Sequence, residues 1–210
     1  MKKRIIKLLL ILILFIILIV LYFTIQKIFI LKEIYNQSQI SSYSFRQEDM
    51  NHVFEVCKKE NDGIMKLYTK KDDNILIHTF TFVRKNSVKY VFNETDKTYK
   101  IDNGVNNNEL SFINPLNDNL FSQKGDFNII DFSFNYRISN VNYNGNDCYS
   151  IIRTIKNDNG NSYKNEFIVD KEMGIVLYNK TSNIEYSNYK LNSIDDVQLP
   201  NLTEYNKTED

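Results

Sequence analysis

The chain has 210 residues, and the roughly 175 that follow an N-terminal anchor are enough for one domain with a sizeable core. It carries 26 basic and 26 acidic residues, but six basic and no acidic residues lie within positions 1–32, so the remainder has 20 basic against 26 acidic residues and a net charge of −6. Because an acidic domain repels phosphate backbones, we expect no nucleic-acid binding.

The first predicted element is a transmembrane helix over residues 8–25. From Leu8 to Ile25 the chain has eighteen residues without a charge, and at about 1.5 Å per residue this helix covers roughly 27 Å of hydrocarbon. A cleaved signal peptide, the alternative, normally has an apolar region of about 7–15 residues that ends at small residues. The sequence has neither feature, so we predict an uncleaved signal-anchor that follows a short cytoplasmic tail over residues 1–7.

The distribution of basic residues predicts the orientation of this helix. The span is preceded by four basic residues and followed by two: Lys2, Lys3, Arg4 and Lys7, and then Lys27 and Lys32. The positive-inside rule keeps such an N-terminus in the cytoplasm, so we expect a single-pass protein of the plasma membrane with an extracytoplasmic C-terminal domain. Ile28, Leu31 and Ile34 continue the helical spacing to about Asn36. Residues 26–40 are therefore either a stalk or the first packed helix of the domain.

Residues 41–205 are predicted to form a mainly β domain of the α+β class, followed by a C-terminal tail over 206–210. Short segments rich in β-branched and aromatic residues alternate with turn signals, which is typical of an antiparallel sheet. Asp-Gly or Asn-Gly pairs beginning at Asp62, Asn103, Asn144 and Asn159 suit tight hairpin turns. The predicted strands are 43–48, 53–58, 63–69, 75–84, 88–94, 98–102, 127–134, 137–143, 148–155, 163–170, 175–180 and 184–191.

An apolar surface is predicted on this sheet. Residues 109–123 have neither clean alternation nor a clean helical face, and we expect a short helix or lid over the sheet there. In residues 75–83, alternation would place Leu76, His78, Phe80 and Phe82 on one face and further apolar side chains on the other. The sequence therefore predicts either an open apolar cavity or a plain two-layer core. The residues that would line the cavity are Leu76, Phe80, Phe82, Phe112, Phe121, Phe132 and Phe134.

Three segments within residues 138–200 resemble a known fold family. Residues 141–151 (VNYNGNDCYSI) read as strand, glycine turn and strand; in residues 167–177 (FIVDKEMGIVL) an aromatic-rich strand ends in Asp-x-x-x-Gly; residues 189–200 (YKLNSIDDVQLP) end in an acidic exit to a proline. These segments resemble the periplasmic lipoprotein carriers and their relatives, LolA, LolB and RseB, especially membrane-tethered members in bacteria without an outer membrane. The resemblance implies a strongly curved antiparallel half-barrel whose concave apolar face is closed by short helices. Members use that face for acyl chains, or the domain as a regulatory sensor.

The sequence contains no catalytic or metal-binding pattern. His52 and His78 lie on different predicted strands without a cysteine or carboxylate at metal-ligand spacing. Neither a nucleophile motif nor a phosphate-binding glycine loop occurs, and the adjacent acids at 72–73 and 195–196 would point to opposite faces of a strand. We therefore expect no enzyme, no cofactor and no metal.

Cys57 and Cys148 leave two alternatives open. Both would lie outside the membrane, where a disulfide that closes so long a loop would stabilise the fold by about 4–5 kcal/mol. Two free thiols are equally compatible with the sequence.

The functional expectation follows from the anchor, the apolar sheet and the resemblance. The composition, without alanine or tryptophan and rich in Asn, Ile and Lys, indicates an A/T-rich bacterial genome. We expect a membrane-anchored binding module of the cell envelope for lipid, lipoprotein or a regulatory envelope partner. The alternative is a structural or protein-interaction component of the envelope with no ligand cavity.

Overall fold

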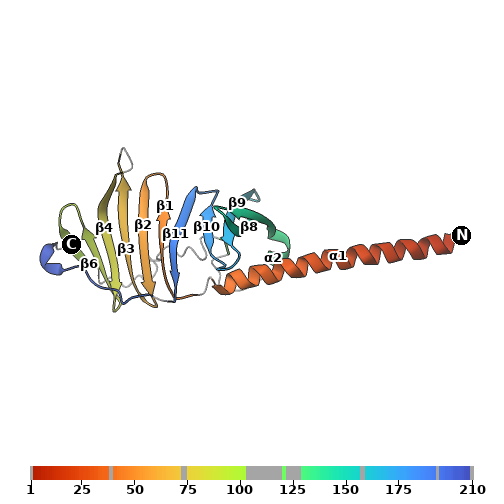
Figure 1. The fold of residues 1–210 in the computed structure, drawn as a ribbon, viewed down its shortest axis with the longest axis horizontal. Helices are drawn as coiled ribbons and strands as arrows, with labels where there is room; N and C mark the ends of the chain where they lie inside the picture. The colour runs from red at the N-terminus through yellow and green to blue at the C-terminus, as the bar shows by residue number, and fades with distance from the viewer. Residues whose placement is uncertain are drawn as a thin grey trace.

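A long N-terminal helix projects from one twelve-stranded sheet (Figure 1). The structure is a computed structural model that describes residues 2–37, 40–71, 75–102, 120–121, 129–156, 159–192 and 194–208. Its strands lie in the order β12-β6-β5-β4-β3-β2-β1-β11-β10-β9-β8-β7. Neighbouring described strands are antiparallel except β12 and β6, which are parallel. The predicted fold class, a mainly β (α+β) domain with a curved, half-barrel-like antiparallel sheet and short helices after a long apolar helix, is confirmed.

The elements have the following bounds. The helices are α1 (Lys2–Gln37), α2 (Ile129–Asn135) and the 3₁₀ turn η2 (Leu202–Glu204). The strands are β1 (Ser42–Glu48), β2 (His52–Lys59), β3 (Asp62–Lys70), β4 (Leu76–Lys85), β5 (Val88–Asn93), β6 (Thr98–Asp102), β7 (Tyr136–Tyr143), β8 (Asn146–Lys156), β9 (Ser162–Asp170), β10 (Val176–Asn179), β11 (Ile184–Leu191) and β12 (Asn206–Lys207). Eleven of the predicted strands match β1 to β11 within two residues at either end.

The predicted strand 127–134 is wrong, because these residues contain α2 instead. Ile130, Phe132 and Phe134 alternate as in a strand and would share one face there, yet Phe132 is buried whereas Ile130 and Phe134 are exposed. Phe132 packs on Tyr136, the first residue of β7, with ring centroids 5.1 Å apart. The Ser133 hydroxyl donates to the carbonyl of Ile129 one turn earlier. The sequence of this short segment is compatible with both a strand and a helix, and its packing against the rest of the protein favours the helix.

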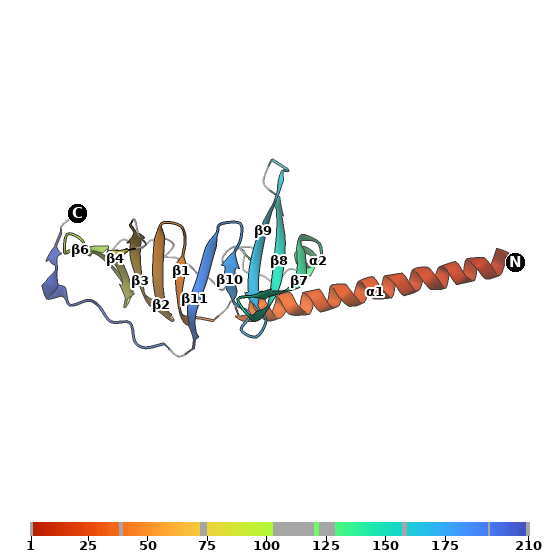
Figure 2. The same cartoon turned by 45° about the horizontal axis from the view of Figure 1, so that its top comes forward.

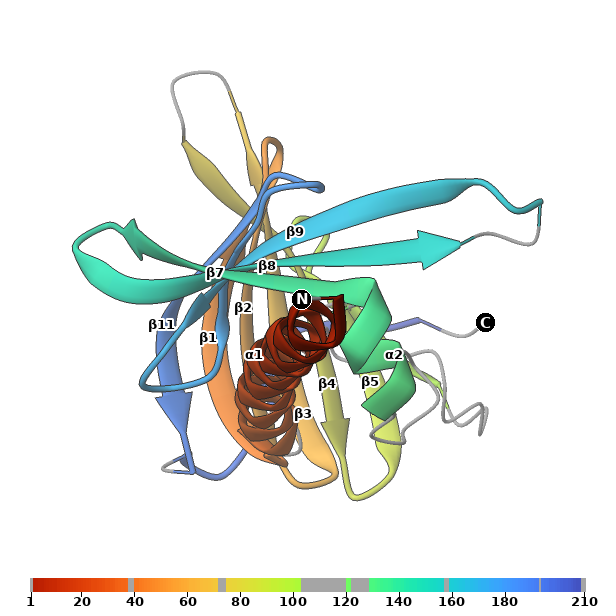
Figure 3. The same cartoon turned by 90° about the vertical axis from the view of Figure 1, so that its right-hand side faces the viewer.

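The last turns of α1 are part of the domain core. Leu31 and Ile34 are 0% and 3% exposed and pack with Tyr43 and Phe45 of β1 and Val56 of β2. We call the sheet face that contacts α1 the inner face and the opposite one the outer face. Figure 3 views α1 almost end-on against the sheet, with α2 beside it. Residues 26–37 are thus a packed helix and not a stalk.

The turn between β9 and β10 explains how α1 is seated. The Asp170 carboxylate accepts hydrogen bonds from the main-chain N–H groups of Glu172 and Met173, at 2.9 and 2.7 Å. Gly174 completes the turn with a φ of +65°, and a Cβ atom on it would lie 3.0 Å from Cγ of Gln37. The Asp-x-x-x-Gly segment noted in the sequence therefore forms a tight turn, in which the aspartate accepts main-chain hydrogen bonds and the glycine has a positive φ. Glycine serves a second purpose here, because it lets the end of α1 approach the turn.

The C-terminal segment 194–208 returns along the sheet to its far end (Figure 2). Val197 packs with Val83 and Phe92 in a second, small core. Beyond η2, Asn206 and Lys207 form β12 and pair with Thr98 and Tyr99 of β6. Residues that the sequence assigned to the tail thus belong to the sheet.

Candidate binding site

The inner face stays apolar beyond the part that α1 covers. Val56 of β2 pairs with Met65 of β3, which pairs with Phe82 of β4, which pairs with Val91 of β5. Residues paired across antiparallel strands lie on the same face, so these side chains form one row. Met65, Phe82 and Val91 are only half-buried. Phe80 lies beside the row, with its ring centroid 6.1 Å from that of Phe82.

A β-bulge changes the predicted faces of β4. The pairing shifts from Leu67–Phe80 to Tyr68–His78, which leaves Thr79 as an extra residue. His78 consequently lies with Thr81 on the outer face, and its Nε2 atom is 2.9 Å from the Thr81 hydroxyl. By the same register Leu76 also lies on the outer face, and it is 38% exposed. The predicted grouping of Leu76 and His78 with Phe80 and Phe82 is therefore wrong.

The other predicted cavity residues separate into different environments. Phe121 and Phe132 are buried against each other and against Tyr136, so they fill the core. Phe134 is 82% exposed on α2. Phe112 and most of the predicted lid 109–123 lie outside the described residues. Of the six predicted residues that the structure describes, it brings Phe80 and Phe82 together on a half-buried inner face and leaves the other four elsewhere.

A groove of about 630 Å³ lies between α1 and β7, the last strand of the described sheet. Its α1 wall extends from Val20 to Ile30, and its sheet wall includes Arg137, Ile138 and Tyr149. Lys27 holds the two walls together, because its ammonium group donates hydrogen bonds to the main-chain oxygens of Ser133 and Tyr136. The full lining is Val20, Phe23, Thr24, Gln26, Lys27, Ile30, Tyr136, Arg137, Ile138, Ser139, Asn140 and Tyr149.

The chemistry of this groove is amphiphilic. Val20, Phe23 and Ile138 offer apolar surface, and Lys27 adds a cation. Arg137 and Ser139 alternate along β7 with the inner-facing Tyr136 and Ile138, so their side chains lie on the outer face. Apolar walls with a few polar groups are typical of small-molecule sites. A ligand that has both an apolar chain and an anionic group matches both kinds of side chain. The sequence did not predict this groove, because its two walls are more than a hundred residues apart in the chain.

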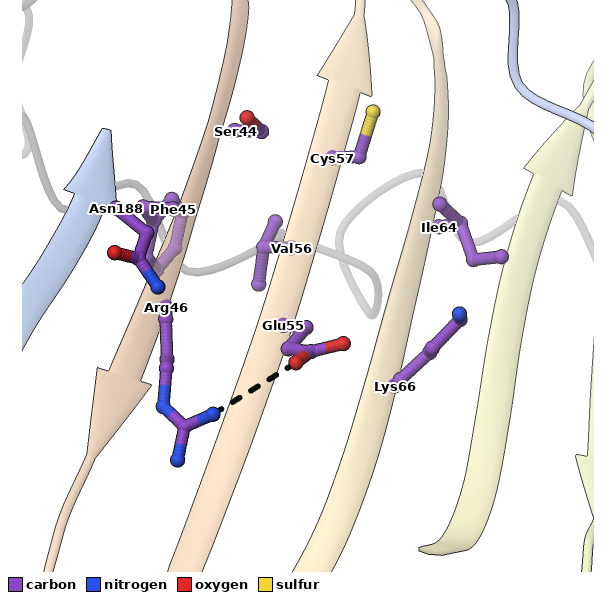
Figure 4. A pocket seen from close by; sticks show the side chains of 9 residues that line it. All are labelled: Ser44, Phe45, Arg46, Glu55, Val56, Cys57, Ile64, Lys66 and Asn188. Carbon is purple, nitrogen blue, oxygen red and sulfur yellow. Dashed lines mark ion pairs between the residues drawn. The ribbon is translucent and has the colours of Figure 1, made fainter. Parts of the chain in front are cut away.

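A second, smaller groove of about 270 Å³ lies on the outer face of β1 to β3 (Figure 4). Arg46 and Glu55 form an ion pair across it, with an N–O distance of 3.8 Å. Cys57 also lines it, and burial, followed by the negative charge of Asp195, raises the pKa of this thiol. The thiol is therefore protonated at neutral pH and is a poor nucleophile. The groove contains polar contacts but no activated group.

A polar cluster around Glu94 closes the far end of the outer face. The Glu94 side chain is 8% exposed. Its carboxylate accepts hydrogen bonds from the Thr81 hydroxyl at 2.6 Å, the Tyr205 hydroxyl at 2.7 Å and the Lys97 ammonium at 2.9 Å. Burial raises the pKa of Glu94, but these three donors outweigh it and lower the pKa to about 2. Because the Thr81 hydroxyl donates its hydrogen to Glu94, its oxygen is left to accept a hydrogen bond from Nε2 of His78.

The hydrogen bonds of the Glu94 cluster stabilise the fold and leave no group prepared for proton transfer. An ionised carboxylate with three donors is a satisfied acceptor and has no tendency to take up a proton at neutral pH. Tyr205 brings the C-terminal segment to this carboxylate and also packs on Phe92, with ring centroids 4.9 Å apart. The Glu94 cluster thus fastens the C-terminal segment to β4 and β5.

The histidines and cysteines form no combined site. His52 lies at the start of β2, and His78 belongs to the outer face of β4. Across the part of the chain that the structure describes, no three His, Cys, Asp or Glu side chains are placed to hold a metal ion. Cys57 and Cys148 are free thiols on β2 and β8, with β1, β11, β10 and β9 between those strands. Of the two alternatives left open by the sequence, the structure has the free thiols.

The structure supports the predicted membrane helix, whereas the comparisons with known proteins do not test the predicted family. Within the described ranges, one helix, Ile5–Gln37, is long and apolar enough to cross a membrane. No protein-family model, curated protein or solved structure matches this chain, so the resemblance to the lipoprotein carriers stays a prediction.

Proposed function

We propose that the chain is a single-pass membrane protein with a cytoplasmic N-terminus, whose extracytoplasmic domain binds a lipid or the acylated end of a lipoprotein in the α1–β7 groove. The main observation behind this proposal is that one wall of the groove belongs to the predicted transmembrane helix and the other to the sheet. Val20, Phe23 and Thr24 belong to the uncharged run 8–25, whereas Arg137 and Ile138 belong to the sheet. A groove built in this way meets the outer leaflet directly, so an acyl chain enters it from the side without crossing water.

The charges support an anionic amphiphile. Lys27 is the first charged residue after the span and therefore lies where the headgroups begin. Its ammonium group is a positive charge in the lining of the groove.

Lipid carried by the purified protein tests the proposal. The full chain, extracted from membranes in mild detergent, is expected to show bound lipid in native mass spectrometry. Lys27→Glu reverses the cation in the groove, and Asn140→Phe, at a position of β7 on the same face as Ile138, fills the groove, so each should reduce the bound fraction. Lys164→Glu and Ser162→Phe are matched controls at exposed positions of β9, and they should bind as the parent does. Equal lipid binding by all five proteins would contradict the proposal.

The packed end of α1 favours a second function, a structural or regulatory interaction component of the envelope with no ligand cavity. Leu31 and Ile34 occupy the inner face over β1 and β2, which is the part of a half-barrel that would otherwise hold a ligand. This function predicts that crosslinking in intact cells captures a protein on the domain while the extracted chain carries no lipid. We expect no enzymatic activity in either case, because burial raises the pKa of both thiols and Glu94 is held as a satisfied carboxylate.

A further inference from the structure

The exposed side of α2 is apolar. Ile129, Ile130 and Phe134 are 57%, 72% and 82% exposed, whereas Phe132 is buried in the core. On α1, Phe29 is also 65% exposed. Each large apolar side chain gains about 1.5–3 kcal/mol on full burial, so a group of them in water is costly. Such a group marks contact with another apolar phase.

The position of α2 along the axis of α1 indicates that this apolar environment is the membrane. The hydrogen bonds from Lys27 to the carbonyls of Ser133 and Tyr136 place α2 beside the turn that follows the uncharged run 8–25. The headgroup layer extends roughly 5–8 Å beyond the hydrocarbon on each side. At about 1.5 Å per residue, this layer corresponds to residues 26–30 of α1. Figure 1 accordingly has α2 at the end of the domain from which the long part of α1 departs.

We propose that α2 is a second membrane contact, in which Ile129, Ile130 and Phe134 enter the headgroup layer of the leaflet that α1 crosses. The inference rests on the proposed span and adds a contact that the span alone does not require. Two attachments fix the rotation of the domain about the axis of α1, and they hold the α1–β7 groove against the lipid. Because α2 contains no basic residue, the contact is apolar and should be insensitive to salt.

A single tryptophan reports on this contact, because the chain has none of its own. We would reconstitute full-length Phe134→Trp in phosphatidylcholine vesicles with and without brominated acyl chains. The emission is expected to shift to shorter wavelength, to lose intensity with brominated lipid and to resist quenching by aqueous acrylamide. High salt should change none of these results.

Two further variants separate the possible outcomes. Met50→Trp, at a 75% exposed residue between β1 and β2, should respond to acrylamide and not to brominated lipid. Phe15→Trp, in the span, should respond to brominated lipid. If Phe15→Trp is quenched by the lipid and Phe134→Trp is not, the α2 contact is overturned while the span stands. If neither is quenched, the span and the proposed function fail together. Protection of Phe134→Trp from acrylamide without quenching by lipid would assign α2 to a contact with protein, which in these vesicles is the same chain or a second copy of it, and would overturn the membrane contact.

Discussion

At the end of the sheet nearest α1, side chains from the helix and from both halves of the sheet form one apolar core, which includes Leu31, Ile34 and Phe45. At the opposite end, the buried apolar core of the described residues consists of Val83, Phe92 and Val197, and the carboxylate of Glu94 accepts hydrogen bonds beside it. The first end is therefore stabilised by apolar burial, which does not depend on pH, and the second by a charge that does. One sheet thus combines two kinds of stability.

The largest expected effect comes from removing the α1 side of the first core. A chain that begins at Gln26 keeps Leu31 and Ile34, whereas a chain that begins at Ile40 loses both. Each loss costs about 2–5 kcal/mol, and together they approach the total stability of about 5–15 kcal/mol of a typical domain. We expect cooperative urea unfolding, followed by circular dichroism, for the longer chain only. Equal midpoints for the two chains would show that α1 is a mere tether.

A smaller loss is expected from Gly174→Ala, which tests how closely α1 approaches the sheet. The substitution places a Cβ at a φ of +65° and 3.0 Å from Gln37, so we expect about 2–3 kcal/mol of destabilisation in the full chain. Gly145→Ala is the matched control, because its φ is +85° and no atom lies within 4 Å of the added Cβ. It should cost only about 1 kcal/mol. Similar unfolding midpoints for both variants would mean that the approach of α1 adds nothing.

The second end of the sheet is tested by Glu94→Gln. Loss of a charged hydrogen-bond acceptor costs about 1.5–3 kcal/mol at neutral pH, whereas Glu172→Gln at an exposed position should be neutral. The pKa of Glu94 in the folded chain lies below the ordinary 4.5, at about 2. Its stabilisation is therefore present above about pH 4.5 and is lost as the pH falls toward 2. Thermal unfolding of Glu94→Gln should depend less on pH in that window than the parent does; parallel profiles would refute the assignment.

The smallest expected effect is that of reduction. Because Cys57 and Cys148 are free thiols, a reducing agent should leave the unfolding midpoint unchanged. Half-buried Cys57 should react with an alkylating reagent before Cys148, which is 0% exposed. Mass analysis after alkylation measures both, and a mass two hydrogens lower before reduction would reveal a disulfide.

Much of the fold could be predicted from the sequence because its information is local. Hairpin strands such as β7 and β8 are recognisable from alternation and from the positive-φ pair Asn144–Gly145 between them. β12 could not be predicted, since a strand of two residues has no periodicity and its partner β6 is more than a hundred residues away. Apolar residues occupy alternate positions in the segment of α2, as in a strand, and the helix that it forms is explained by its packing beside α1.

The candidate site was much less predictable. The bulge at Thr79 reverses the face of every residue before it in β4, and nothing in the local sequence indicates that insertion. The α1–β7 groove and the Glu94 cluster join segments that are distant in the chain. Such sites depend on topology, which the spacing of residues within one segment does not encode.

The absence of a break in α1 between residues 2 and 37 has a mechanical consequence. At about 1.5 Å per residue this helix is a lever of roughly 54 Å, and its end is embedded in the sheet. Spans tilt by about 20° on average, and the tilt changes with bilayer thickness. With α1 across a membrane as proposed, a thinner or thicker bilayer would therefore swing the whole sheet relative to the membrane plane, because no hinge between α1 and the sheet absorbs the motion.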